Sequence, residues 1–434
     1  MSSRANSVNF MSRRRFLTQG VAGAALAVAL PSLAVAAPAD QSLGGAVEWR
    51  QSYDSGSQIK NVRSSAPILS AQTLQATEQA AERYREIVAR GGWQQLSDER
   101  LKLGSKSQAV VALRQRLIAS NDLEASGGNS QIFDSYVEAA VKRFQARHGL
   151  GATGVVGPQS LAAFNVPADI RLKQLEINVV RLRSLQGNLG QRFVTANIPA
   201  AYVETVENGQ VATRHNAVVG KIDRQSPIMT AKVLNINFNP FWTVPASIIR
   251  KDLIPKMQAD PNYINDQKIH VFDSKGQEVK PQFINWNSME ATNYRFRQEP
   301  GALNSLGTVR INIANPYGVY MHDTPSKGLF GDDFRFHSSG CMRVQNVREY
   351  IQWLLKDTPG WGRPQIDEAI RSGQRVDAQL TQPVPVYWVY VTAWATPEGA
   401  VQFRDDIYAK DGMGPGAVTQ ALQQAEEESG EPVH

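Results

Sequence analysis

The single cysteine of this 434-residue chain, Cys341, lies in a segment of small and polar residues, 336–344 (FHSSGCMRV). A lone cysteine has no partner for an internal disulfide. The alternative is an inert thiol that packs as a small hydrophobic residue. Two serines and a glycine precede Cys341 and Arg343 follows it, which is not an apolar core pattern. We therefore interpret Cys341 as a candidate nucleophile.

A histidine lies upstream of Cys341, close enough in the sequence for both side chains to reach one cleft. His322 precedes Cys341 by 19 residues (341 − 322 = 19) and follows a strand-like stretch, 318–321. Imidazole can take the thiol proton, and the thiolate then attacks a carbonyl group. The backbone around Gly340 presents N–H groups in a turn, which we expect to supply donors for the oxyanion.

The same residues raise the alternative of a metal site. His322, His337 and Cys341 would need a further ligand such as Asp323 or Asp332. The wide spacing of these residues is not typical of zinc modules. We therefore expect neither a metal nor another cofactor.

The N-terminus has the pattern of an export signal. Residues 12–17 (SRRRFL) form a twin-arginine motif, an uncharged apolar run follows over 21–30, and 34–36 (AVA) offers a cleavage site. The apolar run is too short for a membrane anchor. We expect a periplasmic or cell-envelope protein, exported by the twin-arginine route, without a transmembrane anchor after cleavage.

The charge of the mature chain is small. Residues 1–36 hold four arginines and no acidic residue, so their removal lowers the formal charge from +6 to +2. Nucleic-acid-binding proteins usually have a strongly basic domain, so we expect no nucleic acid as a partner. The hydrophobic fraction of 42% suffices for more than one core.

Helical periodicity dominates the first half of the chain. A helix is predicted over 70–90, three helices around small glycine-rich turns over 101–165, and a connecting helix within 166–191. The unit 101–165 resembles the three-helix peptidoglycan-binding domain, on Leu103-Gly104, Phe144-Gln145 and the glycines 149, 154 and 157. Val137 and Thr153 depart from that pattern. Glycan binding and a spacer role both stay open.

From residue 192 the periodicity falls toward two, which favours strands. Strand patterns occur at 193–198, 202–206, 211–219, 232–238, 309–313, 318–321 and 384–393. The polar, partly helical stretch 245–301 interrupts them and is interpreted as a lid. A helix is predicted over 349–355.

Two segments carry a specific resemblance. Residues 315–323 (NPYGVYMHD) and 337–344 (HSSGCMRV) resemble the catalytic motif of the L,D-transpeptidases, the YkuD-type cysteine enzymes of peptidoglycan. Residues 239–245 (NPFWTVP) resemble the segment that opens the lid in the larger members, which also have an N-terminal peptidoglycan-binding domain. The usual Ser-His-Gly-Cys is Ser-Ser-Gly-Cys here, with His337 four residues before the thiol.

The resemblance implies a fold and a set of roles. The fold is α+β, with a mainly β catalytic domain that carries a lid. Cys341 would be the nucleophile, His322 the general base and acid, and the backbone at Gly340 an oxyanion donor. The implied substrate contacts are Arg343, Tyr320, Ser339 and His337. Arg343 in a structural ion pair and Tyr320 packed in its strand are the alternatives for these two residues.

The predicted boundaries follow from these patterns. They are a signal peptide at 1–36, a linker and helical scaffold at 37–100, a peptidoglycan-binding-like domain at 101–165, a connecting helix at 166–191, a catalytic domain at 192–400 with the lid at about 245–301, and a mobile acidic tail at 401–434.

The implied reaction is peptidoglycan cross-linking. The family joins tetrapeptide stems by 3→3 cross-links through a cysteine acyl-enzyme, with stem peptides as donor and acceptor and carbapenems as inhibitors. An L,D-carboxypeptidase would resolve the same acyl-enzyme with water. A non-catalytic peptidoglycan-binding protein is a further alternative, and the attachment of a protein or a D-amino acid to the stem is another.

Overall fold

The helical and the strand periodicities of the sequence correspond to two regions of the computed structural model. It describes residues 64–414, 416 and 419–420. The predicted signal peptide, most of the linker and the acidic residues after 420 lie outside the described residues. Helices precede a mainly β region, which confirms the predicted α+β fold class.

The helical region begins with a capped helix, since the Ser70 hydroxyl accepts from the Thr73 N–H at 3.1 Å. Asp134 caps a later helix through the Val137 N–H at 3.0 Å. The elements are α2 (Ala71–Ala89), α3 (Gln108–Ala119), η2 (Ala125–Gly127), α4 (Ser135–Arg147), α5 (Pro158–Phe164) and α6 (Ala168–Ser184). The helices α3, α4 and α5 are the predicted three, and they enclose a core in which Phe144 stacks on Phe164.

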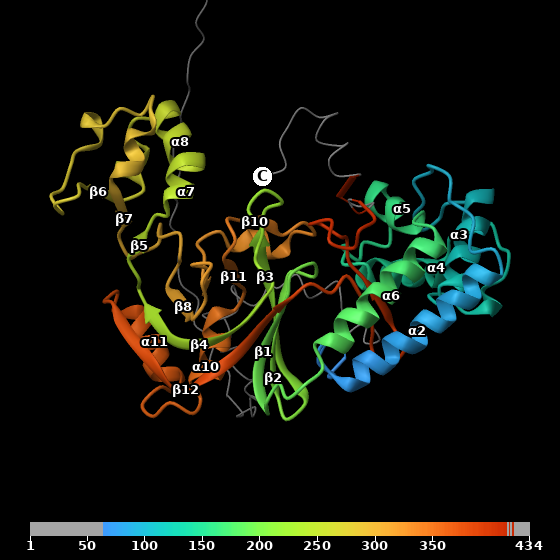
Figure 1. Cartoon of the computed structure of the whole chain (residues 1–434). Helices are drawn as coiled ribbons and strands as arrows, with labels where there is room; N and C mark the ends of the chain where they lie inside the picture. Colours follow the sequence, from blue (N-terminus) through green and yellow to red (C-terminus); the bar gives the residue numbers. More distant parts are fainter. Residues whose placement is uncertain (1–63, 415, 417–418, 421–434) are drawn as a thin grey trace, which may run out of the picture. The chain divides into compact units, whose positions relative to one another are not determined.

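The scaffold helices α2 and α6 lie side by side (Figure 1) and are joined by two ion pairs. A two-stranded sheet, β13 (Ala393–Ala395) and β14 (Val401–Phe403), packs on the same apolar cluster. The prediction of a mobile tail from 401 was therefore wrong for its first residues. Asp411 is buried because Arg181 and the Thr392 hydroxyl compensate its charge, at 2.5 and 2.7 Å.

The mainly β region is built on one large sheet. Its strands are β1 (Arg192–Asn197), β2 (Tyr202–Glu207), β3 (Gln210–Gly220), β4 (Met229–Phe238), β8 (Val309–Ile313), β9 (Met321–His322), β10 (Phe336–Ser338), β11 (Met342–Val344) and β12 (Val376–Val389). Their order is β10-β3-β11-β9-β8-β4-β12-β1-β2. A further pairing of β2 with β3 closes the sheet on itself.

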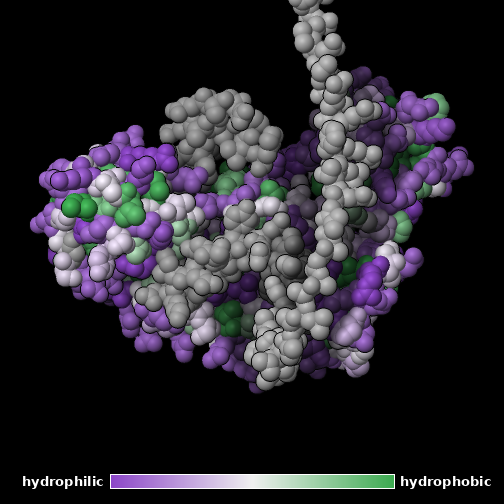
Figure 2. All heavy atoms as spheres, turned by 180° about the vertical axis from the view of Figure 1, so that it is seen from behind, coloured by the Kyte–Doolittle hydropathy of each residue, from purple (hydrophilic) through white to green (hydrophobic). Residues whose placement is uncertain are grey.

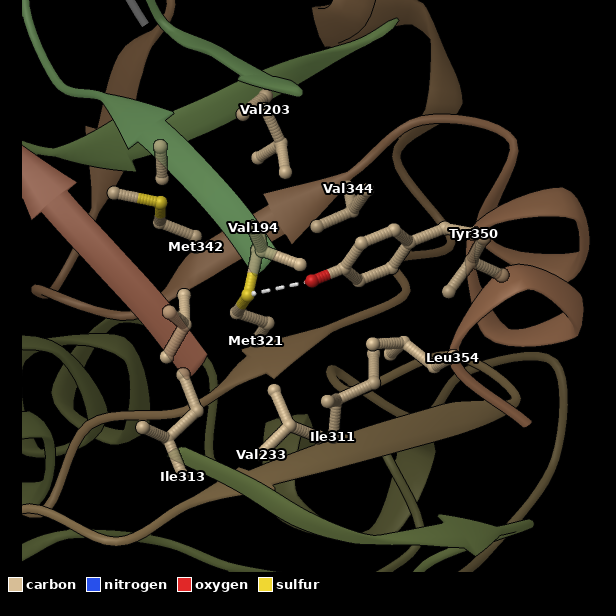
Figure 3. Close-up of a cluster of buried hydrophobic side chains, with 14 of the residues drawn as sticks. Val194, Val203, Val233, Ile311, Ile313, Met321, Met342, Val344, Tyr350 and Leu354 are labelled. Atoms are coloured by element: carbon tan, nitrogen blue, oxygen red, sulfur yellow. Dashed lines mark hydrogen bonds between the residues drawn. The ribbon is translucent and has the colours of Figure 1, made fainter. Parts of the chain in front are cut away.

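Two helices, α10 (Val347–Leu355) and α11 (Arg363–Arg371), contribute side chains to the main core. The sequence predicted α10 but not α11. It also began β12 eight residues late, because the alternation of β12 is interrupted where the pairing with β4 shifts between Gln379 and Val384. The core lies beneath β9, where the Tyr350 hydroxyl donates to Met321 Sδ at 3.2 Å (Figure 3).

The lid is more ordered than the sequence indicated. It has a three-stranded sheet in the order β5-β7-β6 and a hydrophobic core of its own that includes Ile264 and Phe296. The lid elements stand apart from the large sheet (Figure 1). They are β5 (Trp242–Thr243), α7 (Ala246–Ile248), the π-helix η3 (Ile249–Leu253), α8 (Ile254–Ala259), α9 (Tyr263–Asp266), β6 (Ile269–Phe272), η4 (Pro281–Phe283), η5 (Met289–Asn293) and β7 (Arg295–Gln298).

The lid strands escaped prediction because each is only two to four residues long, which is too short for an alternating pattern to stand out. Figure 2 shows that the described surface on its visible face is largely hydrophilic, with only small apolar spots. The large apolar side chains are thus used mostly in the cores of the three-helix unit, the lid and the main sheet.

Candidate active site

Two adjacent parallel strands bring the predicted histidine and cysteine to one place. β11 runs beside β9, with Met342 opposite Met321 and Arg343 opposite His322. The Met342 N–H donates to the Tyr320 carbonyl at 3.1 Å. Successive side chains of a strand point to opposite faces. Because both methionines point into the core (Figure 3), Tyr320, His322, Cys341 and Arg343 share the other face.

That face opens into a cavity of about 400 Å³. Six of the seven predicted site residues line it: Tyr320, His322, His337, Ser339, Cys341 and Arg343. The seventh, Gly340, lies in the turn between β10 and β11. Its φ of +108° is a backbone conformation that glycine adopts without strain, as the Ser-Gly-Cys motif indicates.

Hydrogen bonds fix the conformation of the cysteine turn. The Ser338 hydroxyl donates to the Cys341 carbonyl at 2.5 Å and accepts from the Gly340 N–H at 3.2 Å. The amide of Gly340 is therefore already engaged. Within the predicted donor region around Gly340, the next N–H, that of Cys341, is the better candidate for an oxyanion donor.

His322 is buried and oriented by the main chain. Its Nδ1 lies 2.5 Å from the Asp323 carbonyl oxygen. A carbonyl can only accept, so Nδ1 carries the proton and Nε2 is left to accept one. Burial, reinforced by the Arg343 charge, lowers the pKa of His322 to about 3. The imidazole is therefore neutral at neutral pH and can act as a base.

The thiol is also neutral in the resting site. Burial raises the pKa of Cys341 to about 11, although a hydrogen bond from the Tyr320 backbone and the charge of Arg310 oppose the rise. Cys341 remains partly exposed toward the cavity. A neutral thiol and a neutral imidazole that line one cavity suit proton transfer during attack rather than a preformed ion pair.

The residues that line this cavity lie in a segment that matches a known family. Residues 191–363 match the family described as "L,D-transpeptidase catalytic domain", named YkuD, and residues 106–164 match "Putative peptidoglycan binding domain". The chain carries an L,D-transpeptidase catalytic domain.

A curated relative supports the same assignment. The "Putative L,D-transpeptidase" of Haemophilus influenzae is 35% identical over 240 residues, which are 55% of this chain and 48% of the relative. The chain therefore spans about half the length of this curated relative.

Solved L,D-transpeptidase structures are also similar to this chain. One from Mycobacterium smegmatis is 14% identical, covers 46% of this chain and 58% of its own, and has a TM-score of 0.23. An LD transpeptidase in complex with imipenem has 14% identity, coverages of 46% and 59%, and a TM-score of 0.22.

Two arginines flank the histidine of the L,D-transpeptidase domain. Arg310 lies opposite His322 from the β8 side, and its guanidinium carbon is 4.2 Å from the centre of the Tyr320 ring. Arg310 was not among the predicted site residues. It could have been recognised as an arginine between the buried side chains of the β8 strand pattern. Arg343 forms no ion pair with any residue that the structure describes. The structural ion pair considered as an alternative for Arg343 is therefore not found among those residues.

The remaining predicted residues lie at the rim. The His337 Nε2–H donates to the Phe334 carbonyl at 2.9 Å, and burial lowers the pKa of His337. The Ser339 hydroxyl accepts from Arg224 at 2.9 Å. Arg224, in the loop before β4, also forms a two-point ion pair with Asp252 of the lid. Sequence reasoning missed both residues of this pair, because they lie far from the cysteine motif.

The lid supplies a large part of the cavity wall. Its lining residues there are Pro245, Ser247, Ile248, Asp252, Leu253, Lys256, Tyr263, Gln267, Ile269 and Gln298. Within the described residues there is no group of three or more His, Cys, Asp or Glu side chains placed to hold a metal ion. None of the helices in that part of the chain combines the length and apolarity needed to cross a membrane.

Proposed function

We propose that this protein is a peptidoglycan L,D-transpeptidase that forms 3→3 cross-links through an acyl-enzyme on Cys341. The observation that carries the proposal is the pairing of β9 with β11, because it brings a neutral base, a thiol and an unpaired guanidinium into one cavity. A thiol with a base beside it is the arrangement that acyl transfer requires.

The first half-reaction releases the terminal D-alanine of a tetrapeptide stem. His322 Nε2 takes the thiol proton while Cys341 Sγ attacks the carbonyl of the preceding residue, the L-centre. The carbonyl oxygen becomes an oxyanion beside the Cys341 N–H. When the intermediate collapses, the C–N bond breaks and His322 returns the proton to the leaving amine.

The second half-reaction resolves the thioester. A side-chain amine of a second stem attacks the carbonyl and gives its proton to His322. The C–S bond breaks, the thiol regains a proton, and the two stems are joined by a new amide. The cavity lining includes Lys221 and Arg343, whose positive charges suit the carboxylates of stem peptides.

The L,D-carboxypeptidase reaction is the nearest alternative, because water can replace the amine. We expect the lid to favour cross-linking, because it supplies much of the cavity wall and a wall of this kind excludes water. A non-catalytic peptidoglycan-binding protein would not need His322 beside Cys341.

Incubation with purified tetrapeptide muropeptides tests the proposal. Cross-linked dimers identified by mass support a transpeptidase. Tripeptides alone would indicate a carboxypeptidase, and unchanged substrate at high enzyme concentration would refute both. Products that carry an added amino acid or protein would point to exchange chemistry.

The helical domain and the N-terminus extend the proposal. We expect residues 101–165 to hold the enzyme on its polymer, and sedimentation of this fragment with purified cell walls separates binding from a spacer role. We also propose export by the twin-arginine route. Changing Arg13 and Arg14 to lysine should retain the protein inside the cell in a fractionation experiment.

A further inference from the structure

A short loop connects β3 to the cysteine turn. Residues 221–225 leave Gly220 and fold back tightly, so that a Cβ on Gly220 would lie 2.2 Å from the Arg224 carbonyl oxygen and 2.6 Å from the Ser226 nitrogen. Only glycine allows this approach of backbone to backbone. The loop therefore ends with Ser226 directly above the turn that carries Cys341.

A tyrosine from the far end of the chain holds both ends of this loop. The Tyr408 hydroxyl donates to the Gly220 carbonyl at 2.5 Å and accepts from the Ser226 N–H at 3.2 Å. The Tyr408 N–H donates to the Tyr390 hydroxyl at 2.8 Å, and that hydroxyl donates to Asp406 at 2.6 Å. Burial raises the pKa of Tyr408 to about 12, so its hydroxyl stays protonated and able to donate.

Ser226 connects this loop to the turn that carries Cys341. Its hydroxyl accepts from the Gly220 N–H at 3.0 Å and donates to the Gly340 carbonyl at 2.9 Å. The Gly340 carbonyl and the Cys341 N–H belong to one planar peptide and point in opposite directions. Fixing the carbonyl oxygen therefore fixes the direction of the Cys341 N–H. The positive φ of Gly340 makes this restraint necessary, since glycine has many other conformations.

We propose that Ser226 and Tyr408 are positioning residues that set the peptide plane of Gly340–Cys341 and thereby aim the oxyanion donor. This inference rests on the proposed function. It assigns a role to residue 408, which lies outside the matched catalytic domain at 191–363 and in the segment that the sequence suggested to be mobile. Both residues act on the peptide plane and not on the thiol. Their substitution should therefore slow acyl transfer but leave alkylation of the thiol nearly unchanged.

Two reactions of the same thiol test the proposal. Acyl transfer from p-nitrophenyl acetate passes through an oxyanion, whereas alkylation by iodoacetamide does not. In the full chain, Ser226→Ala should slow acyl transfer by about 10- to 100-fold and leave alkylation within about twofold. Ser226→Thr, which keeps the hydroxyl, should restore most of the acyl transfer. Tyr408→Phe should act in the same direction as Ser226→Ala.

Ser372→Ala is the matched control. The Ser372 hydroxyl also accepts from one N–H and donates to one carbonyl, but it lies at the exposed end of α11. Both rates should be unchanged in this variant. An equal loss of both rates in Ser226→Ala, or unchanged acyl transfer in both Ser226→Ala and Tyr408→Phe, would overturn the inference.

The nitrophenyl ester separates this inference from the proposed function. A protein that takes the acyl group but makes no product from muropeptides would refute the function, and the ratio of the two rates would still decide the role of Ser226. If muropeptides are cross-linked but Ser226→Ala and Tyr408→Phe both transfer the acyl group as fast as the parent, the function stands and the inference fails.

Discussion

Arg343 lies directly opposite His322 where β11 pairs with β9. The pairing fixes a guanidinium beside the proposed base, and the Arg343 charge reinforces the effect of burial on the pKa of His322. Burial in turn lowers the pKa of Arg343, which has no ion-pair partner among the described residues. A half-buried cation without a counter-ion among those residues is costly, so a substrate carboxylate should bind there favourably.

Arg343→Gln should therefore weaken the use of the donor stem. We expect kcat/KM for tetrapeptide substrates to fall by about 10- to 100-fold, the loss expected for one charged hydrogen bond. Steady-state kinetics against donor concentration measures it. Arg348→Gln, which removes an arginine from an outer ion pair at 3.7 Å, is the control and should leave the value unchanged. Equal kinetics for both variants would remove Arg343 from the substrate site.

Cys341→Ser should abolish product formation without changing the fold. The chain has no other thiol, and a serine hydroxyl occupies nearly the same space. The loss should be about 10³-fold or more, by analogy with the removal of a nucleophile in other acyl-transfer enzymes. Muropeptide turnover and the circular dichroism spectrum are the two measurements. Near-normal turnover by a folded variant would rule out Cys341 as the nucleophile.

The alkylation of Cys341 should depend steeply on pH. Because burial raises its pKa to about 11, only about one thiol in ten thousand is ionised at pH 7. The rate with iodoacetamide should rise about tenfold per pH unit from pH 7 to about 10. N-acetylcysteine, with its pKa near 8.5, should level off earlier. A plateau below pH 7 would instead reveal a thiolate paired with a protonated His322.

A carbapenem should acylate Cys341 once per chain. The strained lactam carbonyl would meet the same thiol, base and oxyanion donor as the stem peptide. Intact-protein mass spectrometry should show one adduct on the parent and none on Cys341→Ser. An adduct that persists in the variant, or its absence from active enzyme, would contradict this expectation.

Release of the lid should shift the products toward hydrolysis. Asp252 of the lid pairs with Arg224, which in turn donates to Ser339 beside the nucleophile. Asp252→Asn should loosen this contact, admit water, and raise the ratio of tripeptide to dimer products. Replacement of residues 248–298 by a Gly/Ser linker should raise it further, provided that the main sheet still folds. Asp266→Asn, on the exposed side of α9, is the control.

An unchanged product ratio and rate in both lid variants would show that the lid does not influence the choice between amine and water. A fall in both products together would indicate instead that the lid is needed to bind the donor.

The local sequence was sufficient for the chemistry of the two central residues. Cys341 and His322 could be recognised because the cysteine is unique, the motif around it is short, and both lie at the ends of neighbouring elements in the chain. The alternation of side chains between the two faces of a strand is also a local property. It places Tyr320 and His322 on the same face of one strand, and Cys341 and Arg343 on the same face of the other. The three-helix unit and most strands followed from periodicity in the same way.

The tertiary structure decided which distant residues meet at that face. Arg310, Arg224 and Tyr408 reach the site through the pairing of β8 with β9, the lid contact and the packing of the last described segment. Strand register and the packing of distant segments depend on the burial of many side chains together. A short stretch of sequence does not show this combined burial. The sequence by itself therefore determined the thiol, the histidine proposed as its base and the faces of their strands. Only the folded chain decided the charges around them, the wall that the lid provides and the peptide plane that aims the Cys341 amide.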